Sequence, residues 1–305
     1  MDVGIHSKLS MQQYLSLRAL SSGLCNTILQ QSPHHAKRQQ DEPTDDPSTE
    51  SDIGTIIHDA LLEGVDRIAA IDPELHRSKP NKANPEGAIP KGWTNNAIRS
   101  ARDAARAEGK LPMLAGQVAH VLAAVEAAKA FIDSSELAGL FDNGAPEQTL
   151  IWMDEGVRCK ARPDWLSEDR SILCHVKTTT GSAQPDSWIK NQMINNGYDV
   201  AAMFYERGLY ALPGDGADAP TSVFLVIEQQ PPFGCSLIGL SPMLADLASR
   251  KVERAIKTWA RCQQSGRYPC YPTRICYADP RPWDLQQEEE RSMFSEQELQ
   301  GGIPL

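Results

Sequence analysis

The chain of 305 residues lacks an uninterrupted apolar run near the roughly 20 residues that a membrane-spanning helix needs. Its first residues, Met1 to Ser7, also lack the basic and apolar regions of a secretory signal peptide. These two absences argue against a membrane protein and against a secreted one. They predict a cytoplasmic protein without a membrane partner.

An excess of positive charge is also missing, because 40 acidic residues outnumber 30 basic ones and give a net charge of −10. A protein that coats nucleic acid needs a broad basic surface, so this class is excluded. A nuclease is not excluded, since it needs carboxylates for a metal ion and only a local basic track for phosphates. The long loop predicted at about residues 72–92 contains three lysines and four prolines. It is either such a track or a solvated loop without function.

Cysteine pairs with metal-ligand spacing are missing as well. The seven cysteines are an odd number, and no two of them form a Cys-x-x-Cys motif. Some nucleases of CRISPR adaptation and some helicase-associated nucleases bind an iron–sulfur cluster through one early and three late cysteines. The corresponding residues here are Cys25, Cys262, Cys270 and Cys276. The step from Cys262 to Cys270 is too long for such a pair, so we expect unrelated reduced thiols rather than a cluster.

What is present is an alternation of helical and strand-like patterns. Apolar residues at helical spacing predict helices over residues 53–63, 94–109, 112–139, 185–210 and 243–264. Runs of β-branched and aromatic residues predict strands over 147–153, 157–166, 171–178, 221–228 and 236–240. Short polar turns separate the first three strands, which predicts an antiparallel meander.

This order predicts an α/β fold, with a mixed β-sheet that contains an antiparallel meander and is flanked by helices. We expect a single domain over residues 1–283. A mobile acidic loop is predicted at about residues 38–51, and an acidic C-terminal tail over residues 284–305.

Two motifs on consecutive predicted strands carry the chemistry, Arg162-Pro163-Asp164 and His175-Val176-Lys177. Asp164 and Lys177 are thirteen residues apart across one turn, so they can lie on adjacent strands. His175 and Lys177 should share a strand face because side chains alternate. Pro163 should kink its strand and open the sheet there. Glu147, on the preceding strand, and His58, on the helix after Gly54-Thr55, can reach the same edge.

Hydrolysis of a phosphodiester bond needs these residue types. A divalent cation must polarise the phosphate, and its ligands must leave one face open. A positively charged side chain must steady the attacking water or the developing charge. Taken singly, each of these residues is more often a turn, core or edge-strand residue. Their matched spacing on consecutive strands favours a site.

The motifs resemble those of the RecE-like exonucleases (exodeoxyribonuclease VIII type) of the PD-(D/E)XK nuclease superfamily, over roughly residues 8–283. Gly54 to His58 resembles the first motif of that family, whose histidine binds metal. Cys159 to Leu166 resembles the second, whose aspartate binds metal, and Val176 to Thr179 resembles the lysine motif. The resemblance implies a restriction-endonuclease-like core.

Two positions depart from the family pattern. The family has an aspartate at the position of His175 and usually a glutamine at the position of Ala201. A histidine offers one nitrogen in place of two anionic oxygens, which predicts weaker Mg²⁺ binding and makes Mn²⁺ an alternative. The site is therefore a working variant, a natural inactive copy, or a site with an introduced substitution at residue 175.

The resemblance implies a metal-dependent exonuclease that digests linear double-stranded DNA from 5′ to 3′ and leaves single-stranded ends for recombination, as in a phage or prophage. It implies a homo-oligomeric ring and a single-strand annealing protein as partner. The implied metal ligands are His58, Asp164 and His175, and the implied catalytic residues are Lys177, Asp164 and His175. Glu147 is a further catalytic candidate because of its place on the preceding strand. Thr178, Thr179, Tyr198 and Arg162 are the implied DNA contacts. The alternative is an inactive protein of the same fold that binds DNA ends.

Overall fold

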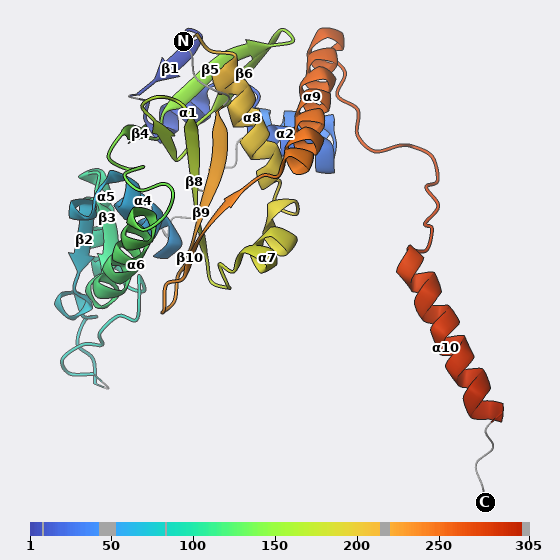
Figure 1. Cartoon of the computed structure of the whole chain (residues 1–305). Helices are drawn as coiled ribbons and strands as arrows, with labels where there is room; N and C mark the ends of the chain where they lie inside the picture. The colour runs from blue at the N-terminus through green and yellow to red at the C-terminus, as the bar shows by residue number, and fades with distance from the viewer. Residues whose placement is uncertain (8, 43–52, 83, 214–219, 301–305) are drawn as a thin grey trace, which may run out of the picture. The chain divides into compact units, whose positions relative to one another are not determined.

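The computed structural model describes residues 1–7, 9–42, 53–82, 84–213 and 220–300 (Figure 1). The chain divides into two compact units, Met1–Cys270 and Tyr271–Leu305. The sheets lie in the first unit. The described part of the second unit contains the helix α10 (Pro282–Gln300).

A five-stranded mixed sheet forms the centre of the first unit, in the order β10-β9-β8-β7-β4. Its strands are β4 (Gly144–Pro146), β7 (Trp165–Ser167), β8 (Ile172–Thr179), β9 (Thr221–Glu228) and β10 (Cys235–Gly239). The strands β8 and β9 pair in parallel along their whole length, and the other neighbours are antiparallel. A parallel pair needs a helical crossover, and the chain between β8 and β9 provides one. The predicted α/β fold with a mixed sheet is confirmed.

A second sheet contains three antiparallel strands in the order β1-β5-β6. They are β1 (Gly4–His6), β5 (Thr149–Asp154) and β6 (Val157–Ala161). Glu155 and Gly156 have φ angles of 48° and 76°, as a tight type I′ hairpin turn requires. The single strand predicted over residues 157–166 is in fact two strands. Pro163 has no N–H for the β6 ladder, so the chain leaves this sheet and enters β7 of the other one.

Three predicted helices agree closely with α4 (Ile53–Glu63), α5 (Asn96–Ala107) and α9 (Pro242–Ser265). Two others are shorter than predicted. Leu111–Leu114 is the strand β3, which pairs in parallel with β2 (Ile68–Ile71), so α6 runs only over Ala115–Asp133. The stretch 185–210 is divided into α7 (Pro185–Trp188), a π-helical turn η3 (Ile189–Met193) and α8 (Tyr198–Tyr210). Gly197, at φ 68°, breaks the helix because that backbone conformation is left-handed.

Helices cover two parts of the apolar core. On one side α2 (Ser22–Gln30), α8 and α9 lie against β5 and β6 (Figure 1). Trp152, Phe204 and Trp259 are fully buried there. On the other side α4 and α6 pack together, α4 against β8 and α6 against β9 and β10. By length and composition α6 would suit a membrane span, the one such helix in the described part of the chain. It packs against α4, and its Val121 and Val125 are fully buried.

The structure describes one of the two predicted loops almost completely and the other only in part. Residues 43–51 of the predicted acidic loop lie outside the described residues, and its first part continues α3 (Pro33–Asp41). The predicted basic loop lies between β2 and α5. It begins with the short 3₁₀ helix η2 (Pro73–His76) and has no strand or α-helix among its described residues. The remaining short elements are α1 (Met11–Ser16) and the 3₁₀ helix η1 (Val65–Arg67).

Candidate metal centre

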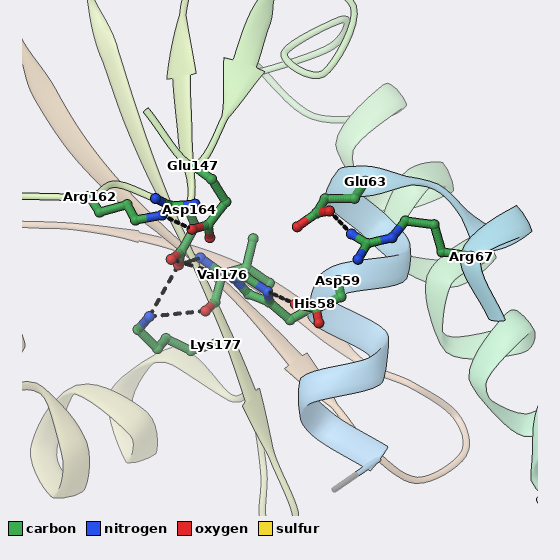
Figure 2. Close-up of polar contacts among 9 residues, drawn as sticks. All are labelled: His58, Asp59, Glu63, Arg67, Glu147, Arg162, Asp164, Val176 and Lys177. Atoms are coloured by element: carbon green, nitrogen blue, oxygen red, sulfur yellow. Dashed lines mark hydrogen bonds and ion pairs between the residues drawn. The ribbon is translucent and has the colours of Figure 1, made fainter. Parts of the chain in front are cut away.

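Asp164 lies where the chain passes from one sheet to the other, and its carboxylate is the centre of a polar cluster (Figure 2). Its Oδ2 accepts the backbone N–H of Val176 at 2.7 Å and the ammonium of Lys177 at 3.3 Å. Burial alone would raise the pKa of Asp164, but Lys177 and His58 hold that pKa well below its usual range. Asp164 is therefore an ionised carboxylate at neutral pH.

Lys177 lies on β8, and its side chain extends from this strand to the carboxylate of Asp164. Its Nζ also donates to the carbonyl oxygen of Val176 at 3.0 Å. Burial lowers the pKa of Lys177, but the charge of Asp164 outweighs this effect and the net shift is upward. Lys177 is therefore a cation beside Asp164 at neutral pH, and the spacing of the two motifs predicted that the two residues lie close together.

His58 reaches the cluster from α4, as Figure 2 shows. Its Nε2 is 3.4 Å from Oδ1 of Asp164, and its Nδ1 is 3.0 Å from Oδ1 of Asp59. Burial would lower the pKa of His58, but hydrogen bonds to Asp164 and Asp59 raise it to about 10. Asp59 is a partner that the sequence reasoning missed. A carboxylate directly after a candidate ligand histidine was the available signal, since such a group orients the ring.

Glu147 completes the cluster through an unusual backbone conformation. Its φ angle is 55°, in the left-handed region that costs a non-glycine residue about 1 kcal/mol or more. Its N–H donates to the carbonyl oxygen of Asp164 at 3.1 Å, so the two candidate ligands are also joined through their backbones. Burial raises the pKa of Glu147, although Arg162 opposes this.

Arg162 fixes the carboxylate of Glu147 by an ion pair through its Nε. Its Nη1 donates to the carbonyl oxygen of Leu9 at 2.8 Å and to Oγ1 of Thr149 at 3.3 Å. The side chain is only 11% exposed. Arg162, predicted as a DNA contact, thus lies against a candidate metal ligand.

The donor set fits a divalent metal ion. His58, Glu147 and Asp164 each offer one ligand atom, and these atoms all lie within 4.8 Å of one another. The two carboxylates suit Mg²⁺ or Mn²⁺, and the softer Mn²⁺ tolerates the imidazole nitrogen better than Mg²⁺ does. Residues from a helix and from two separate turns between strands therefore form one candidate centre.

His175 does not join this group. It shares a face of β8 with Lys177, but its ring is only 4% exposed. The ring stacks on Phe224 at 4.9 Å between centroids and lies 5.2 Å from Tyr205. Its Nε2 is buried without a hydrogen-bond partner among the described residues. Burial lowers the pKa of His175 to about 4, so the ring is neutral at physiological pH.

The other predicted DNA contacts lie near the end of β8 and at the start of α8. Tyr198 stacks on Trp188 at 5.4 Å, and Nζ of Lys177 is 5.8 Å from the centroid of the Tyr198 ring. Thr178 Oγ1 accepts the side-chain amide of Gln229 at 3.2 Å, and Thr179 Oγ1 accepts the N–H of Gly181 at 3.0 Å. Tyr198 therefore borders the cluster, whereas the two hydroxyl groups bind neighbouring loops.

The cysteines considered for an iron–sulfur cluster have different environments. Cys25 and Cys262 are buried, whereas Cys270 and Cys276 are exposed. Among the described residues, the metal-ligand group found in the chain contains no cysteine.

Comparisons with known proteins bear on the fold. A family model described as "PDDEXK-like domain of unknown function (DUF3799)" matches residues 28–279. The crystal structure of a "putative exonuclease" from Eubacterium rectale is similar with a TM-score of 0.51 and 10% sequence identity, over 92% of this chain and 98% of that chain. The crystal structure of SSO0001 aligns with a TM-score of only 0.26 and 16% identity, over 52% of this chain and 70% of that one, which supports no conclusion. No curated protein matches the sequence.

Proposed function

This chain belongs to the family of PDDEXK-like domains (DUF3799), and we propose that it is a metal-dependent nuclease that hydrolyses the phosphodiester bonds of linear double-stranded DNA. One observation carries the proposal. Ligand atoms of His58, Glu147 and Asp164 converge within 4.8 Å, and the ammonium of Lys177 lies 3.3 Å from the central carboxylate.

The residues would divide the work as follows. His58, Glu147 and Asp164 would hold a divalent cation, Mg²⁺ or Mn²⁺. When bound, such a cation polarises a phosphate oxygen and lowers the pKa of a water molecule. Lys177 would orient that water or offset the charge that develops on the phosphate. Arg162 would keep Glu147 in its ligand position.

The position of Glu147 favours an active enzyme over an inactive DNA-binding copy. The residue at 175 is not a carboxylate and lies in an aromatic environment. Glu147 offers a second carboxylate beside Asp164 from a different strand connection. A centre with two carboxylates therefore does not require an acidic residue at position 175.

We extend the proposal to the finer activity of the RecE-like exonucleases on the strength of the motif resemblance. The chain would degrade one strand from a duplex end, from 5′ to 3′, and leave single-stranded DNA for recombination. It would act in the cytoplasm as a homo-oligomeric ring, with a single-strand annealing protein as its partner.

A cleavage assay tests the proposal. Linear duplex labelled at the 5′ or the 3′ end, and a covalently closed circle, are incubated with the protein in Mg²⁺, in Mn²⁺ and in EDTA. We expect metal-dependent loss of the linear duplex only, with release of the 5′ label first. Lys177→Met, which leaves the three ligands in place, should reduce the rate by about 10²–10⁴-fold.

Other outcomes of this assay separate the alternatives. Cleavage of the closed circle would identify an endonuclease. If His175→Asp cuts linear duplex and the chain with His175 does not, the residue at 175 has inactivated the site, as in an inactive copy or after an introduced substitution. If neither protein cuts in any metal, the nuclease proposal is wrong.

A further inference from the structure

Positive charge gathers in one segment of this acidic chain. Residues 65–114, here called the basic lobe, contain nine lysines and arginines against six aspartates and glutamates. Their net charge is +3, whereas the whole chain carries −10. The lobe comprises η1, β2, η2, the long loop, α5 and β3, and residue 83 within it lies outside the described residues.

The long loop of this lobe is held by its own hydrogen bonds. The N–H of Ser78 donates to the carbonyl oxygen of Ala88 at 2.9 Å, and the N–H of Ala88 donates to Oγ of Ser78 at 2.9 Å. Asn84 and Asn81 exchange backbone hydrogen bonds of 3.1 and 3.0 Å. A Cβ at Gly87, where φ is 77°, would lie 2.0 Å from the backbone oxygen of Ser78, so only glycine fits. The described residues of the loop therefore have a defined conformation.

Three lysines project from this loop and its exit. Lys79, Lys82 and Lys91 are exposed, and none of them forms an ion pair with a described residue. Other cations of the lobe do have acidic partners. Arg77 lies 3.8 Å from Glu74, and Lys110 lies 3.0 Å from Glu108. The three lysines thus have no acidic partner among the described residues, on a loop whose described backbone is held by hydrogen bonds.

The lobe is attached to the helix that carries His58. Arg67 forms an ion pair with Glu63, at the end of α4, as Figure 2 shows. Nη2 of Arg67 also donates to the carbonyl oxygen of Gly109, 3.0 Å away at the other end of the lobe. An anionic polymer bound to the lobe would therefore be held by an element that is continuous with the metal centre.

We propose that the basic lobe binds the phosphate backbone of duplex DNA through Lys79, Lys82 and Lys91. The inference rests on the proposed function, because a nuclease with a net charge of −10 needs a local basic surface to hold its substrate. Binding of this kind releases counterions from the duplex. Each phosphate neutralised adds about 0.9 to the slope of log affinity against log salt concentration.

The experiment compares two triple variants that remove the same number of charges. Lys79→Gln/Lys82→Gln/Lys91→Gln removes the three lysines of the lobe. Lys129→Gln/Arg250→Gln/Arg254→Gln removes three exposed cations of α6 and α9. Fluorescence anisotropy with a labelled duplex in EDTA measures binding without cleavage, over a salt series. Thermal melting shows whether both variants are folded, and Mn²⁺ titration by electron paramagnetic resonance shows whether the metal centre is intact.

We expect the lobe variant to lose about tenfold or more in affinity and up to about 3 units of salt slope, with unchanged Mn²⁺ binding. The control variant should stay within about twofold of the natural sequence in affinity. Equal behaviour of the two variants would overturn the inference while leaving the nuclease proposal intact. If the lobe binds duplex but the protein cleaves it in no metal, the nuclease proposal fails and the inference about the lobe stands. Binding of the natural sequence to anionic vesicles but not to duplex would overturn the assignment of the ligand.

Discussion

His58 and His175 are two imidazoles on neighbouring elements, and their surroundings differ completely. His58 lies between the carboxylates of Asp59 and Asp164, which raise its pKa to about 10. His175 lies between the rings of Tyr205 and Phe224, and burial lowers its pKa to about 4. The same side chain is thus part of a polar cluster in one place and part of an aromatic cluster in the other.

The difference teaches that a position on the correct strand face does not make a ligand. His175 and Lys177 share a face of β8, yet only Lys177 contacts Asp164. The Nε2 atom of His175 has no hydrogen-bond partner among the described residues. A charged ring in this buried place would be desolvated and unpaired, so the neutral ring is favoured, and it packs against the aromatic side chains. We therefore expect substitutions in the polar cluster to affect metal binding strongly and substitutions in the aromatic cluster to affect it little.

Asp164→Asn should cause the largest loss of Mn²⁺ affinity. The substitution removes the charge that His58 and Lys177 contact and that a bound metal ion would share. We expect Mn²⁺ affinity to fall at least about 100-fold, because the loss of a ligand should exceed the 10–100-fold loss typical of a residue beside the ligands. Calorimetric titration measures it, and cleavage should be lost in parallel.

The matched variant is His175→Phe, which keeps the aromatic packing and removes the unpartnered nitrogen. Its Mn²⁺ affinity should remain within about threefold of that of the unsubstituted protein, because none of the three candidate ligands changes. A loss as large as that of Asp164→Asn would mean that residue 175 is a ligand after all.

Glu147→Gln should have the next largest effect. The amide keeps the shape of the side chain but removes the charge of a ligand, and we expect a loss of about 100-fold in Mn²⁺ affinity. The loss should not exceed that of Asp164→Asn, because Asp164 also contacts His58 and Lys177. Glu136→Gln, at an exposed carboxylate outside the site, controls for the change in net charge. If the two variants bind Mn²⁺ equally well, Glu147 is not part of the centre.

The sequence predicts much of this arrangement, because the signals are local. The spacing of Asp164 and Lys177 across one turn predicts two adjacent strands, and their side chains are 3.3 Å apart. The parallel pairing of β8 and β9 follows from the helical stretch between two strand-like runs, which fits a crossover.

Other features depend on contacts that no spacing reveals. Glu147 reaches the cluster only because its φ angle is 55° and because Arg162 holds its carboxylate. The environment of His175 is set by Phe224 on β9 and Tyr205 on α8, which are distant in sequence. These depend on tertiary packing, which a one-dimensional pattern does not encode.

Arg162→Leu should have an intermediate effect that tests how the polar cluster is held together. The substitution keeps an apolar stem but leaves Glu147 without its partner, and we expect Mn²⁺ affinity to fall about tenfold. Arg162→Lys, which retains one charge, should recover part of the loss. A purely structural role would lower the melting temperature in both variants without this difference in Mn²⁺ affinity.

The smallest expected effect is on the pH dependence of stability in the metal-free protein. Titration of the two histidines there is also their most direct comparison. The folded-state pKa of His58 is raised, so its contribution to stability is present below about pH 6.5 and is lost as pH rises toward 10. For His175 the folded-state pKa is lowered, and the unfolded chain binds more protons between about pH 6.5 and 4, so stability falls as pH falls through that window. Nitrogen NMR of the imidazoles, assigned with His58→Gln and His175→Phe, should show a protonated ring and a neutral ring together at pH 7. Two rings that titrate together near pH 6.5 would show that the polar and aromatic clusters do not differ in solution as they do in the structure.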